Sequence, residues 1–307
     1  MIYTAIARDL GLPTSFVRKV AISAHHRYKV YFIPKRRGGR RRICHPAREL
    51  KLLQRWLVGE ILSNLPVHES ALGYRERVST SHIARKHSGS RYYLRMDFAN
   101  FFESIRARDI RILLKRDWAE VSRGFPKADI DRIAQIVCKD EALTVGAPSS
   151  PVLSNAVLSP LDSDIHGVCV ELGCAYSRYA DDLFFSSNAV GVLGRVEELV
   201  TEMVEALKSP DLTLNAAKTV HTSKKHRVRV LGLILTPTGD VSIGRAKKRE
   251  IKALVYRFTQ DEIDTETYAY LRGYLAYLYA AEPSFIDALK KKYSVEAVDK
   301  LLRAHEV

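Results

Sequence analysis

The sequence contains few cysteines and no long apolar stretch. Its four cysteines, Cys44, Cys138, Cys169 and Cys174, form no CxxC pair and show no zinc-ligand spacing. A reduced, cytosolic compartment is the simplest interpretation. No run of about 18 apolar residues occurs, so we expect no membrane span. The N-terminus, MIYTAIARDLGLP, lacks the apolar stretch of a signal peptide. We therefore expect a cytoplasmic protein.

Acidic residues are outnumbered by basic ones, 35 to 49, which gives the 307-residue chain a net charge of +14. A balance this basic indicates a polyanionic partner, with nucleic acid as the first candidate, although a basic protein can also be merely soluble. The length allows two or three subdomains around a sizeable core. Binding that depends on phosphate contacts should weaken steeply as salt rises.

Two adjacent aspartates, Asp181 and Asp182, lie in a run that is otherwise aromatic and apolar. The stretch from Arg178 to Ser187 reads RYADDLFFSS, which predicts a buried strand with a turn near the acids. Neighbouring carboxylates in such a place need a compensating cation. A divalent metal such as Mg²⁺ is the expected partner, because it prefers oxygen ligands. The alternative is a solvated acidic turn.

Two further stretches favour the metal site. Tyr92–Ile105 reads YYLRMDFANFFESI and places a third acid, Asp97, in another strand-like run. Acids brought by two strands to one sheet end could hold two metals, which activate an attacking hydroxyl and neutralise a leaving phosphate. Gly146–Asn155, GAPSSPVLSN, is a small-residue loop that opens a helix and lets backbone approach a nucleotide or template closely.

These three stretches, in this order and at these separations, resemble the reverse transcriptase palm and, within that superfamily, the bacterial retron reverse transcriptases. The resemblance covers roughly Lys29 to Tyr293. It implies an α+β fold of the right-hand polymerase type. Residues 1–92 would form the fingers, with N-terminal helices and a basic hairpin. Residues 93–236 would form the palm with the catalytic carboxylates, and 237–307 a helical basic thumb.

The resemblance also implies the chemistry. A priming hydroxyl attacks the α-phosphorus of a deoxynucleoside triphosphate on an RNA template, and pyrophosphate leaves. Asp97 and Asp181 would be the principal ligands of two Mg²⁺ ions, and Asp182 would assist from the edge of the site. The catalysis would come mainly from positioning and metal electrostatics.

Several residues match the family's nucleotide-binding positions. A hairpin is predicted over 28–45, with the tip KRRGGRRR. It is either a solvated basic turn or a fingers hairpin whose Lys35, Arg41 and Arg42 contact the triphosphate. Phe102 is either a core residue or the ring that excludes a 2′-hydroxyl. Lys218 is either a surface lysine or the lysine that neutralises or protonates the leaving pyrophosphate.

Other residues match positions that contact template or RNA. His87 ends a retron-like Asn-Ala-x-x-His element in which Ile83 replaces the asparagine, or is an ordinary surface or core histidine. In the small-residue loop, Ser149 and Ser150 match positions that contact the template, but they could equally form a simple helix cap. Gly232 stands in a strand predicted over 230–235, where retron enzymes carry Val-Thr-Gly. The last two predicted RNA-binding residues, Arg245 and Lys248, lie in a basic helix that follows Gly244. The alternative is that these residues form only a solvated face of that helix.

Helices are predicted before residue 26, twice within 107–143, from Pro151 to Gly173, over 192–207 and through the tail. The retron resemblance implies a structured non-coding RNA as template and primer. Synthesis from a guanosine 2′-hydroxyl would give a branched RNA–DNA hybrid (msDNA), for antiphage defence with a separate effector protein. Little chain follows the palm, so a host ribonuclease H would remove template. The alternatives are a group II intron or diversity-generating reverse transcriptase, or an RNA–protein scaffold that restrains a toxic effector.

Overall fold

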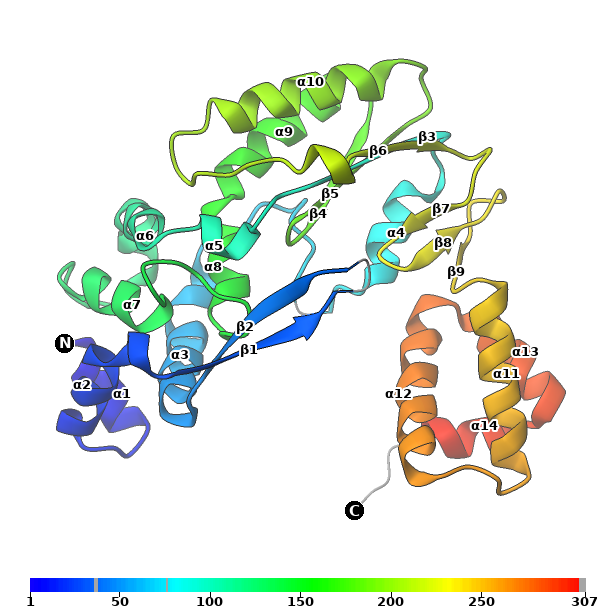
Figure 1. Cartoon of the computed structure of the whole chain (residues 1–307), viewed down its shortest axis with the longest axis horizontal. Coiled ribbons are helices and arrows are strands. Elements are labelled where there is room, and N and C mark those ends of the chain that lie inside the picture. The colour runs from blue at the N-terminus through cyan, green and yellow to red at the C-terminus, as the bar shows by residue number, and fades with distance from the viewer. Residues whose placement is uncertain (36–37, 76, 304–307) are drawn as a thin grey trace. The chain divides into compact units, whose positions relative to one another are not determined.

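The computed structural model describes residues 1–35, 38–75 and 77–303, and its fold is of the predicted α+β kind (Figure 1). The chain divides into two compact units, each of which is described by itself. Unit 1 consists of Met1–Arg75, Arg95–Phe184 and Gly191–Val220. Unit 2 consists of Glu76–Leu94, Phe185–Val190 and His221–Val307. This division follows packing, and it differs from the fingers, palm and thumb boundaries expected from the sequence.

Unit 1 begins with the two predicted short helices, α1 (Ile2–Asp9) and α2 (Thr14–Ile22), which are followed by η1 (Ala24–His26). Gly11 has φ +64 and Pro13 precedes α2 in extended backbone, so the chain reverses between the helices. One face of each helix is fully buried, through Ile2 and Ile6 of α1 and Val17 and Val20 of α2, which anchors this end of the unit.

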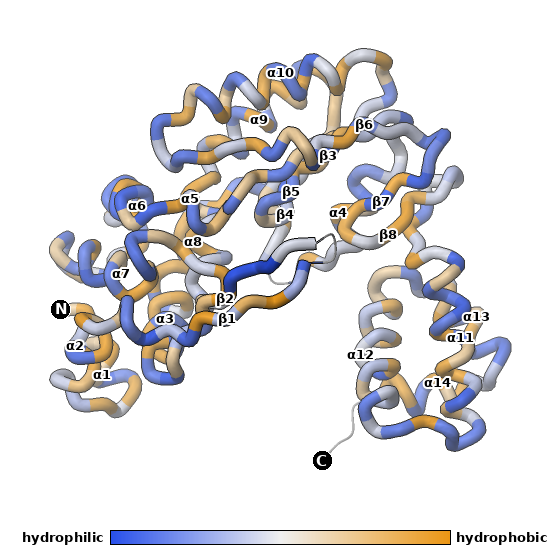
Figure 2. Tube along the Cα trace, viewed as in Figure 1, coloured by the Kyte–Doolittle hydropathy of each residue, from blue (hydrophilic) through white to orange (hydrophobic). Residues whose placement is uncertain are grey.

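The predicted basic hairpin is present as β1 (Tyr28–Pro34) and β2 (Arg40–Pro46). The strands are antiparallel, with Tyr28 opposite Pro46 and Pro34 opposite Arg40. Figure 2 shows the hydrophilic stretch of β2 beside the more apolar β1. Arg36 and Arg37, at the predicted tip, lie outside the described residues. The hairpin leads into α3 (Arg48–Glu60) and η2 (Leu62–Asn64), and α3 packs against β2 (Figure 1).

A four-stranded sheet has the order β4-β5-β3-β6. Its strands are β3 (Tyr92–Asp97), β4 (Ala175–Tyr179), β5 (Asp182–Ser187) and β6 (Val220–Ser223). Helix α9 (Ser159–Glu171) packs against β4, and α10 (Val192–Glu205) packs against α9. The sheet positions the aspartates, because Asp97 ends β3 and Asp182 begins β5.

The single helix predicted from Pro151 to Gly173 is wrong. The structure has two helices there, α8 (Ser150–Val157) and α9, separated at Leu158. Pro160 lies in the first turn of α9, where its missing N–H costs nothing, whereas in a continuous helix it would remove a hydrogen bond and clash with the preceding turn. The other helices of unit 1 are α5 (Phe101–Ser104), α6 (Ala107–Val121), α7 (Asp129–Val137) and η3 (Ala216–Lys218).

Unit 2 contains α4 (Thr80–Ser88) and a three-stranded antiparallel sheet of order β7-β8-β9. The single strand predicted over 230–235 is wrong, since β7 (Val228–Val230) and β8 (Leu233–Leu235) form a hairpin. Leu231 and Gly232 form its turn with φ +49 and +87. Positive φ at both central residues is the geometry of a two-residue turn that matches strand twist. β9 (Val241–Ser242) completes the sheet.

Four helices complete unit 2, as predicted for the tail: α11 (Arg245–Thr259), α12 (Thr265–Ala281), α13 (Pro283–Tyr293) and α14 (Val295–Leu302). Their apolar stripes meet in a core in which Ile251, Leu271 and Leu289 are fully buried. Within the described residues, no helix combines the length and apolar character needed to cross a bilayer.

Candidate active site

Asp97 is the last residue of β3, at the point where the chain leaves the sheet. Its side chain is buried, and its Oδ1 accepts a hydrogen bond of 2.6 Å from the ammonium group of Lys218. The chain then turns at Asn100, whose φ of +45 is a conformation that asparagine tolerates better than most residues, and α5 begins. The buried carboxylate is thus paired with a cation.

The other two aspartates lie at the turn between β4 and β5. Ala180 and Asp181 form the turn, and Asp182 begins β5. Ala180 has φ +54, an uncommon value for a residue with a Cβ. Its carbonyl accepts a hydrogen bond of 3.1 Å from Arg178 Nη1, and the Asp181 carbonyl accepts one of 3.0 Å from the Phe98 N–H. The backbone around Asp181 is therefore held on both sides.

Arg178 is itself fixed by a buried ion pair with Asp162 of α9. Arg178 Nε lies 2.8 Å from Asp162 Oδ1, and Nη2 lies 2.6 Å from Oδ2. The Tyr176 hydroxyl donates a 2.7 Å hydrogen bond to the same carboxylate. Because both charged side chains are only 1% exposed, the pair is shielded from solvent and holds one geometry.

The segment beside β4 supports the turn from a third direction. Arg178 N donates to Ser70 O at 2.7 Å, and Leu72 N donates to Arg178 O at 2.9 Å. A Cβ on Gly73 would lie 2.9 Å from Ala180 N, which is closer than real Cβ contacts. Gly73 O also accepts a 2.7 Å hydrogen bond from Asn155 Nδ2. Only glycine fits this close approach without displacing the turn.

Burial sets the electrostatics of the aspartate pair. It raises the pKa of the Asp181 carboxyl, and the Asp97 carboxylate raises it further. Burial also raises the pKa of Asp182 to about 6, against the opposing effect of Arg95. Arg95 donates from Nε at 2.9 Å and from Nη2 at 2.6 Å to Asp182 Oδ1. Negative charge is therefore costly here, and a nearby cation would stabilise it.

The donor set of Asp97 and Asp181 fits a divalent metal such as Mg²⁺, since both offer carboxylate oxygens and the Asp97 carboxylate raises the pKa of Asp181. In the structure, two cations compensate these carboxylates: Lys218 forms an ion pair with Asp97, and Arg95 forms one with Asp182. Among the described residues, no three His, Cys, Asp or Glu side chains gather into one group able to hold a metal. Asp182, predicted as the secondary ligand, faces Arg95 instead.

The structure brings the predicted nucleotide-binding residues together. A pocket of about 300 Å³ in unit 1 is bordered on one side by Asp181. All five predicted residues line it: Lys35, Arg41, Arg42, Phe102 and Lys218. Arg41 and Lys218 both act to lower the pKa of Asp181, against the effect of burial. The pocket thus has five cationic side chains in its lining, with Asp181 and Glu103 as its two carboxylates, and this excess of positive charge suits a small anionic ligand.

The aromatic residues beside the pocket divide between core and pocket roles. Phe101 is buried and stacks on Phe98 with ring centroids 5.9 Å apart. Phe102 is more exposed and meets Phe101 edge-on at 5.2 Å. Both rings line the pocket, but Phe101 is packed into the core and Phe102 is the more accessible of the two. Tyr74, which also lines the pocket, lies 5.7 Å from Tyr179 between ring centroids.

The two serines of the small-residue loop are fully buried. Ser150 Oγ accepts a 3.2 Å hydrogen bond from Thr144 N. Ser149 Oγ has no hydrogen-bond partner in the described part of the chain, and it does not cap α8. A simple side-chain cap is thus not what the structure shows. Gly146, with φ +116, packs its Cα near Cys44 O of β2, so the loop supports the hairpin.

His87 lies in the interior of unit 2, where it is 1% exposed. Its Nδ1 and Ser186 Oγ are 2.8 Å apart and share a hydrogen bond. Burial lowers the pKa of the imidazole to about 3, so the ring is neutral at physiological pH. This placement favours the core alternative over an RNA contact made by the side chain.

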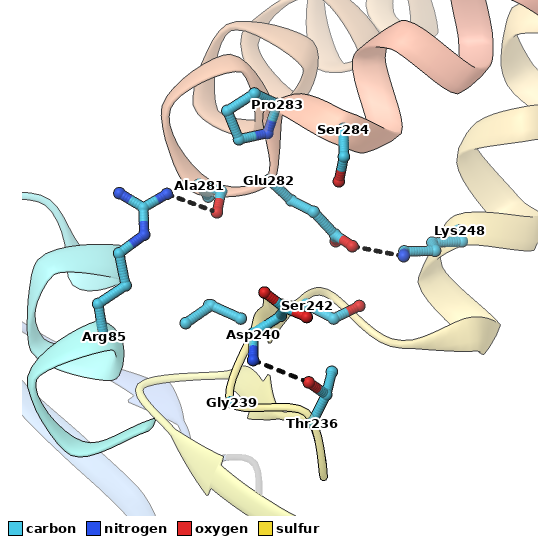
Figure 3. A pocket seen from close by; sticks show the side chains of 11 residues that line it. Arg85, Thr236, Gly239, Asp240, Ser242, Lys248, Ala281, Glu282, Pro283 and Ser284 are labelled. Carbon is cyan, nitrogen blue, oxygen red and sulfur yellow. Dashed lines mark hydrogen bonds and ion pairs between the residues drawn. The ribbon is translucent and has the colours of Figure 1, made fainter. Parts of the chain in front are cut away.

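The remaining predicted RNA-binding residues all lie in unit 2. Gly232 is exposed in the β7–β8 turn, and Arg245 is exposed at the first residue of α11. Lys248 forms an ion pair with Glu282, and both line a pocket of about 470 Å³ that also includes Arg85 (Figure 3). The structure places these residues on one unit but does not gather them into one pocket.

The prediction from the sequence did not include three residues that the structure places at the site: Arg95, Arg178 and Tyr74. Arg95 could have been found, because it precedes Asp97 by two residues and side chains two apart in a strand share a face. Arg178 and Tyr74 carry no such signal, because their roles depend on packing between α9, β4 and a loop.

The chain matches the family model described as "Reverse transcriptase (RNA-dependent DNA polymerase)" over residues 33–235. It is 34% identical to the retron Ec83 reverse transcriptase of Escherichia coli, with 91% of each chain covered. It is 29% identical to the retron Ec86 enzyme of the same organism, with 95% of each covered. It is 30% identical to the retron Mx65 enzyme of Myxococcus xanthus, with 94% of this chain and 70% of that one covered.

Solved structures show the fold at lower identity. Apo telomerase from Candida tropicalis superposes with a TM-score of 0.55 at 14% identity, covering 89% of this chain and 56% of that one. Telomerase from Candida albicans with a telomeric RNA fragment gives 0.53 at 12% identity, covering 91% and 61%. These likenesses extend the shared fold to most of the chain.

Proposed function

The chain belongs to the reverse transcriptase family and, within it, to the retron reverse transcriptases, and from this premise we propose that it copies a structured non-coding RNA into msDNA. As a reverse transcriptase it is an RNA-directed DNA polymerase that uses a template RNA and deoxynucleoside triphosphates. Synthesis begins at a guanosine 2′-hydroxyl, so the product is a branched RNA–DNA hybrid. The complex serves antiphage defence by restraining a separate effector protein, and host ribonuclease H removes the copied template.

We assign the subdomains as fingers over 1–92, palm over 93–236 and thumb over 237–307. The basic hairpin β1–β2 supports the first assignment, since its residues border the same pocket as Asp181. The aspartates at the ends of β3 and β4–β5 support the second. The four-helix tail, with its basic residues at the start of α11, supports the third.

The strongest support for this proposal is the pocket, because its lining contains both the cations of the hairpin and the carboxylate of Asp181. Lys35, Arg41 and Arg42 hold the phosphates of the incoming nucleotide, where the forked guanidinium groups can bind oxygens in pairs. Phe102 lies against the sugar and leaves no room for a 2′-hydroxyl. These contacts orient the α-phosphorus towards the priming hydroxyl.

Asp97 and Asp181 would hold two Mg²⁺ ions, with Asp182 assisting. When bound, the metals lower the pKa of the attacking hydroxyl and neutralise charge on the phosphates. Lys218, which pairs with Asp97 in the structure, can turn to the leaving pyrophosphate and neutralise or protonate it. Arg178 and the Phe98 N–H keep Asp181 in place throughout, because they bind the backbone and not the carboxylate.

The test uses the purified protein with the RNA that accompanies it, Mg²⁺ and labelled deoxynucleotides. We expect label in DNA that stays joined to RNA, with a junction that resists alkali because a 2′-linked nucleotide has no free 2′-hydroxyl. Asp181→Asn should abolish the product, whereas Asp211→Asn, at an exposed position, should not. Incorporation only with an added primer would overturn self-priming, and unchanged incorporation by Asp181→Asn would overturn the assignment of the site.

A further inference from the structure

A second basic surface lies at the opposite end of the hairpin from the nucleotide pocket. It is an open groove of about 700 Å³ in unit 1, formed where β1 begins, β2 ends and α3 starts (Figure 1). Ala47 N donates a 2.8 Å hydrogen bond to Arg27 O, which joins the entry of β1 to the entry of α3. We call this surface the hairpin-base groove.

The hairpin-base groove is lined by cations without a carboxylate. Its basic side chains are Arg27, Lys29, Arg48, Lys51 and Arg55, and no Asp or Glu is among the lining residues. None of these five takes part in an ion pair in the described part of the chain, although Arg27 Nε donates to Ser23 Oγ at 2.7 Å. Such unpaired like charges repel one another, and a polyanion would relieve the repulsion.

Two of the cations lie where a helix disfavours them. Arg48 is the first residue of α3 and Lys51 follows within its first turn, at the end of the helix that carries partial positive charge. The partial positive charge of the helix start is unfavourable for both of these cations. Glu49, also in the first turn, offsets part of this cost but does not line the groove. The arrangement lowers the stability of the free protein and raises its affinity for an anion.

The lining chemistry indicates contact with a phosphate backbone and not with bases. Tyr28 is the sole aromatic side chain, histidines aside, in the lining set, and its hydroxyl accepts a 2.9 Å hydrogen bond from Gln54, so it is part of the packed interior. Stacking platforms for unpaired bases need exposed rings. Lysine and arginine without such rings bind phosphates and position nucleic acid without reading its sequence.

We propose that the hairpin-base groove binds the phosphodiester backbone of a segment of the cognate RNA that lies outside the catalytic pocket. This deepens the proposed function, on which it rests, by adding a second RNA-binding site. The hairpin pairs seven positions from Tyr28↔Pro46 to Pro34↔Arg40. At about 3.4 Å per residue, the groove lies roughly 20 Å along the hairpin from the end that borders the nucleotide pocket. One structured RNA can therefore engage both ends.

The test replaces four groove cations, as Lys29→Gln, Arg48→Gln, Lys51→Gln and Arg55→Gln in one protein. A matched control removes the same charge from exposed positions of unit 1, as Lys115→Gln, Lys127→Gln, Arg195→Gln and Lys208→Gln. RNA affinity is measured between about 50 and 200 mM salt. We expect the magnitude of the slope of log K against log salt to fall by about 3–3.5 in the groove variant, since each of the four lost phosphate contacts removes about 0.7–0.9. The control should keep the wild-type slope.

A second measurement separates this proposal from the polymerase assignment. On a short RNA template with an annealed DNA primer, the groove variant should incorporate deoxynucleotides at the wild-type rate, because the duplex does not reach the groove. Thermal unfolding should show the variant to be at least as stable as wild type. An unchanged salt slope would overturn the proposal. So would normal RNA binding combined with loss of an acidic protein partner, which would make the groove a protein interface.

Discussion

Arg95 donates both of its hydrogen bonds to the same oxygen of Asp182, Oδ1, at 2.9 Å and 2.6 Å. Asp182, at the start of β5, is therefore held by a cation from the neighbouring strand β3, which also carries Asp97. Burial raises the pKa of Asp182 to about 6, and Arg95 works against this effect. The ion pair with Arg95 favours the ionised form of this third carboxylate, which lies beside Asp97 and Asp181.

Replacing Arg95 with glutamine should move the acidic limb of the activity profile to higher pH. Without the guanidinium, burial and the neighbouring carboxylates act unopposed on Asp182, so its pKa should rise above 6. If activity needs the ionised carboxylate, half-maximal activity is then reached at a higher pH. The measurement is kcat/KM for nucleotide incorporation as a function of pH.

Arg95→Lys provides the control for that experiment, since it keeps the charge but loses the forked geometry. It should restore most of the wild-type acidic limb. A glutamine variant whose pH profile coincides with wild type would show that Asp182 does not need to be ionised.

Phe102→Ala should let the enzyme accept ribonucleotides. The ring borders the nucleotide pocket, and removing it opens space beside the sugar. A steric difference of this size is worth about 1–3 kcal/mol, or roughly 10–200-fold in the ratio of kcat/KM for deoxynucleotide over ribonucleotide. Phe101→Leu should lower stability and change that ratio much less, because Phe101, although it also lines the pocket, is buried against Phe98. Equal ratios in Phe102→Ala and wild type would contradict the gate.

Much of the candidate site could be predicted because it lies on local patterns. An acid within an apolar run predicts a strand end, and Asp97 and Asp182 lie at such ends. Alternating apolar residues around two glycines predict a hairpin, and β1–β2 has that form. The convergence of Lys35, Phe102 and Lys218 on one pocket was predictable only through the family resemblance, since these residues are far apart in sequence.

The two wrong predictions of secondary structure, the helix over 151–173 and the strand over 230–235, occurred where the conformation of a single residue ends one element and begins the next. Pro160 divides a continuous apolar pattern into two helices, and periodicity alone does not show this. Leu231 adopts φ +49, which sequence rules assign to glycine or asparagine, so the β7–β8 turn was missed. Arg178 and Gly73 act by contacting the aspartate turn across the fold, and no local pattern reports such contacts.

Arg178→Met should destabilise the protein strongly, because it leaves Asp162 buried without its partner. Breaking a buried pair from one side costs about 3–5 kcal/mol in free energy of unfolding. The double variant Arg178→Met/Asp162→Leu should recover much of that loss, as measured by denaturant unfolding. Activity should stay low in the double variant, since the Ala180 carbonyl loses its donor. Full recovery of both would show that Arg178 has no role in positioning the turn.

His87 should make stability fall on acidification. Burial lowers its pKa in the folded state to about 3, so between that value and the unfolded value of about 6.5 only the unfolded chain takes up the proton. Its contribution is complete above the unfolded pKa and is lost as pH falls, by roughly 2 kcal/mol between pH 7 and pH 5. His87→Gln should flatten this dependence, whereas His226→Gln, at an exposed position, should not. Equal slopes for His87→Gln and wild type would contradict the burial argument.

Gly73→Ala should reduce catalysis more than it reduces stability. The added Cβ would lie 2.9 Å from Ala180 N and 3.2 Å from Tyr179 Cα, so the aspartate turn must shift by a few tenths of an ångström. A displacement of about 1 Å can lower kcat by about 100-fold, because positioning supplies much of the rate, so this smaller shift should still lower kcat measurably. Gly59→Ala is the matched control, since nothing lies within 4 Å of its added Cβ in α3, and it should stabilise the protein slightly. Single-turnover incorporation and thermal unfolding should be measured on both variants. If Gly73→Ala lost stability and activity in proportion, the glycine would serve folding alone; a loss of rate in a stable protein would show that this close approach holds Asp181 in its working position.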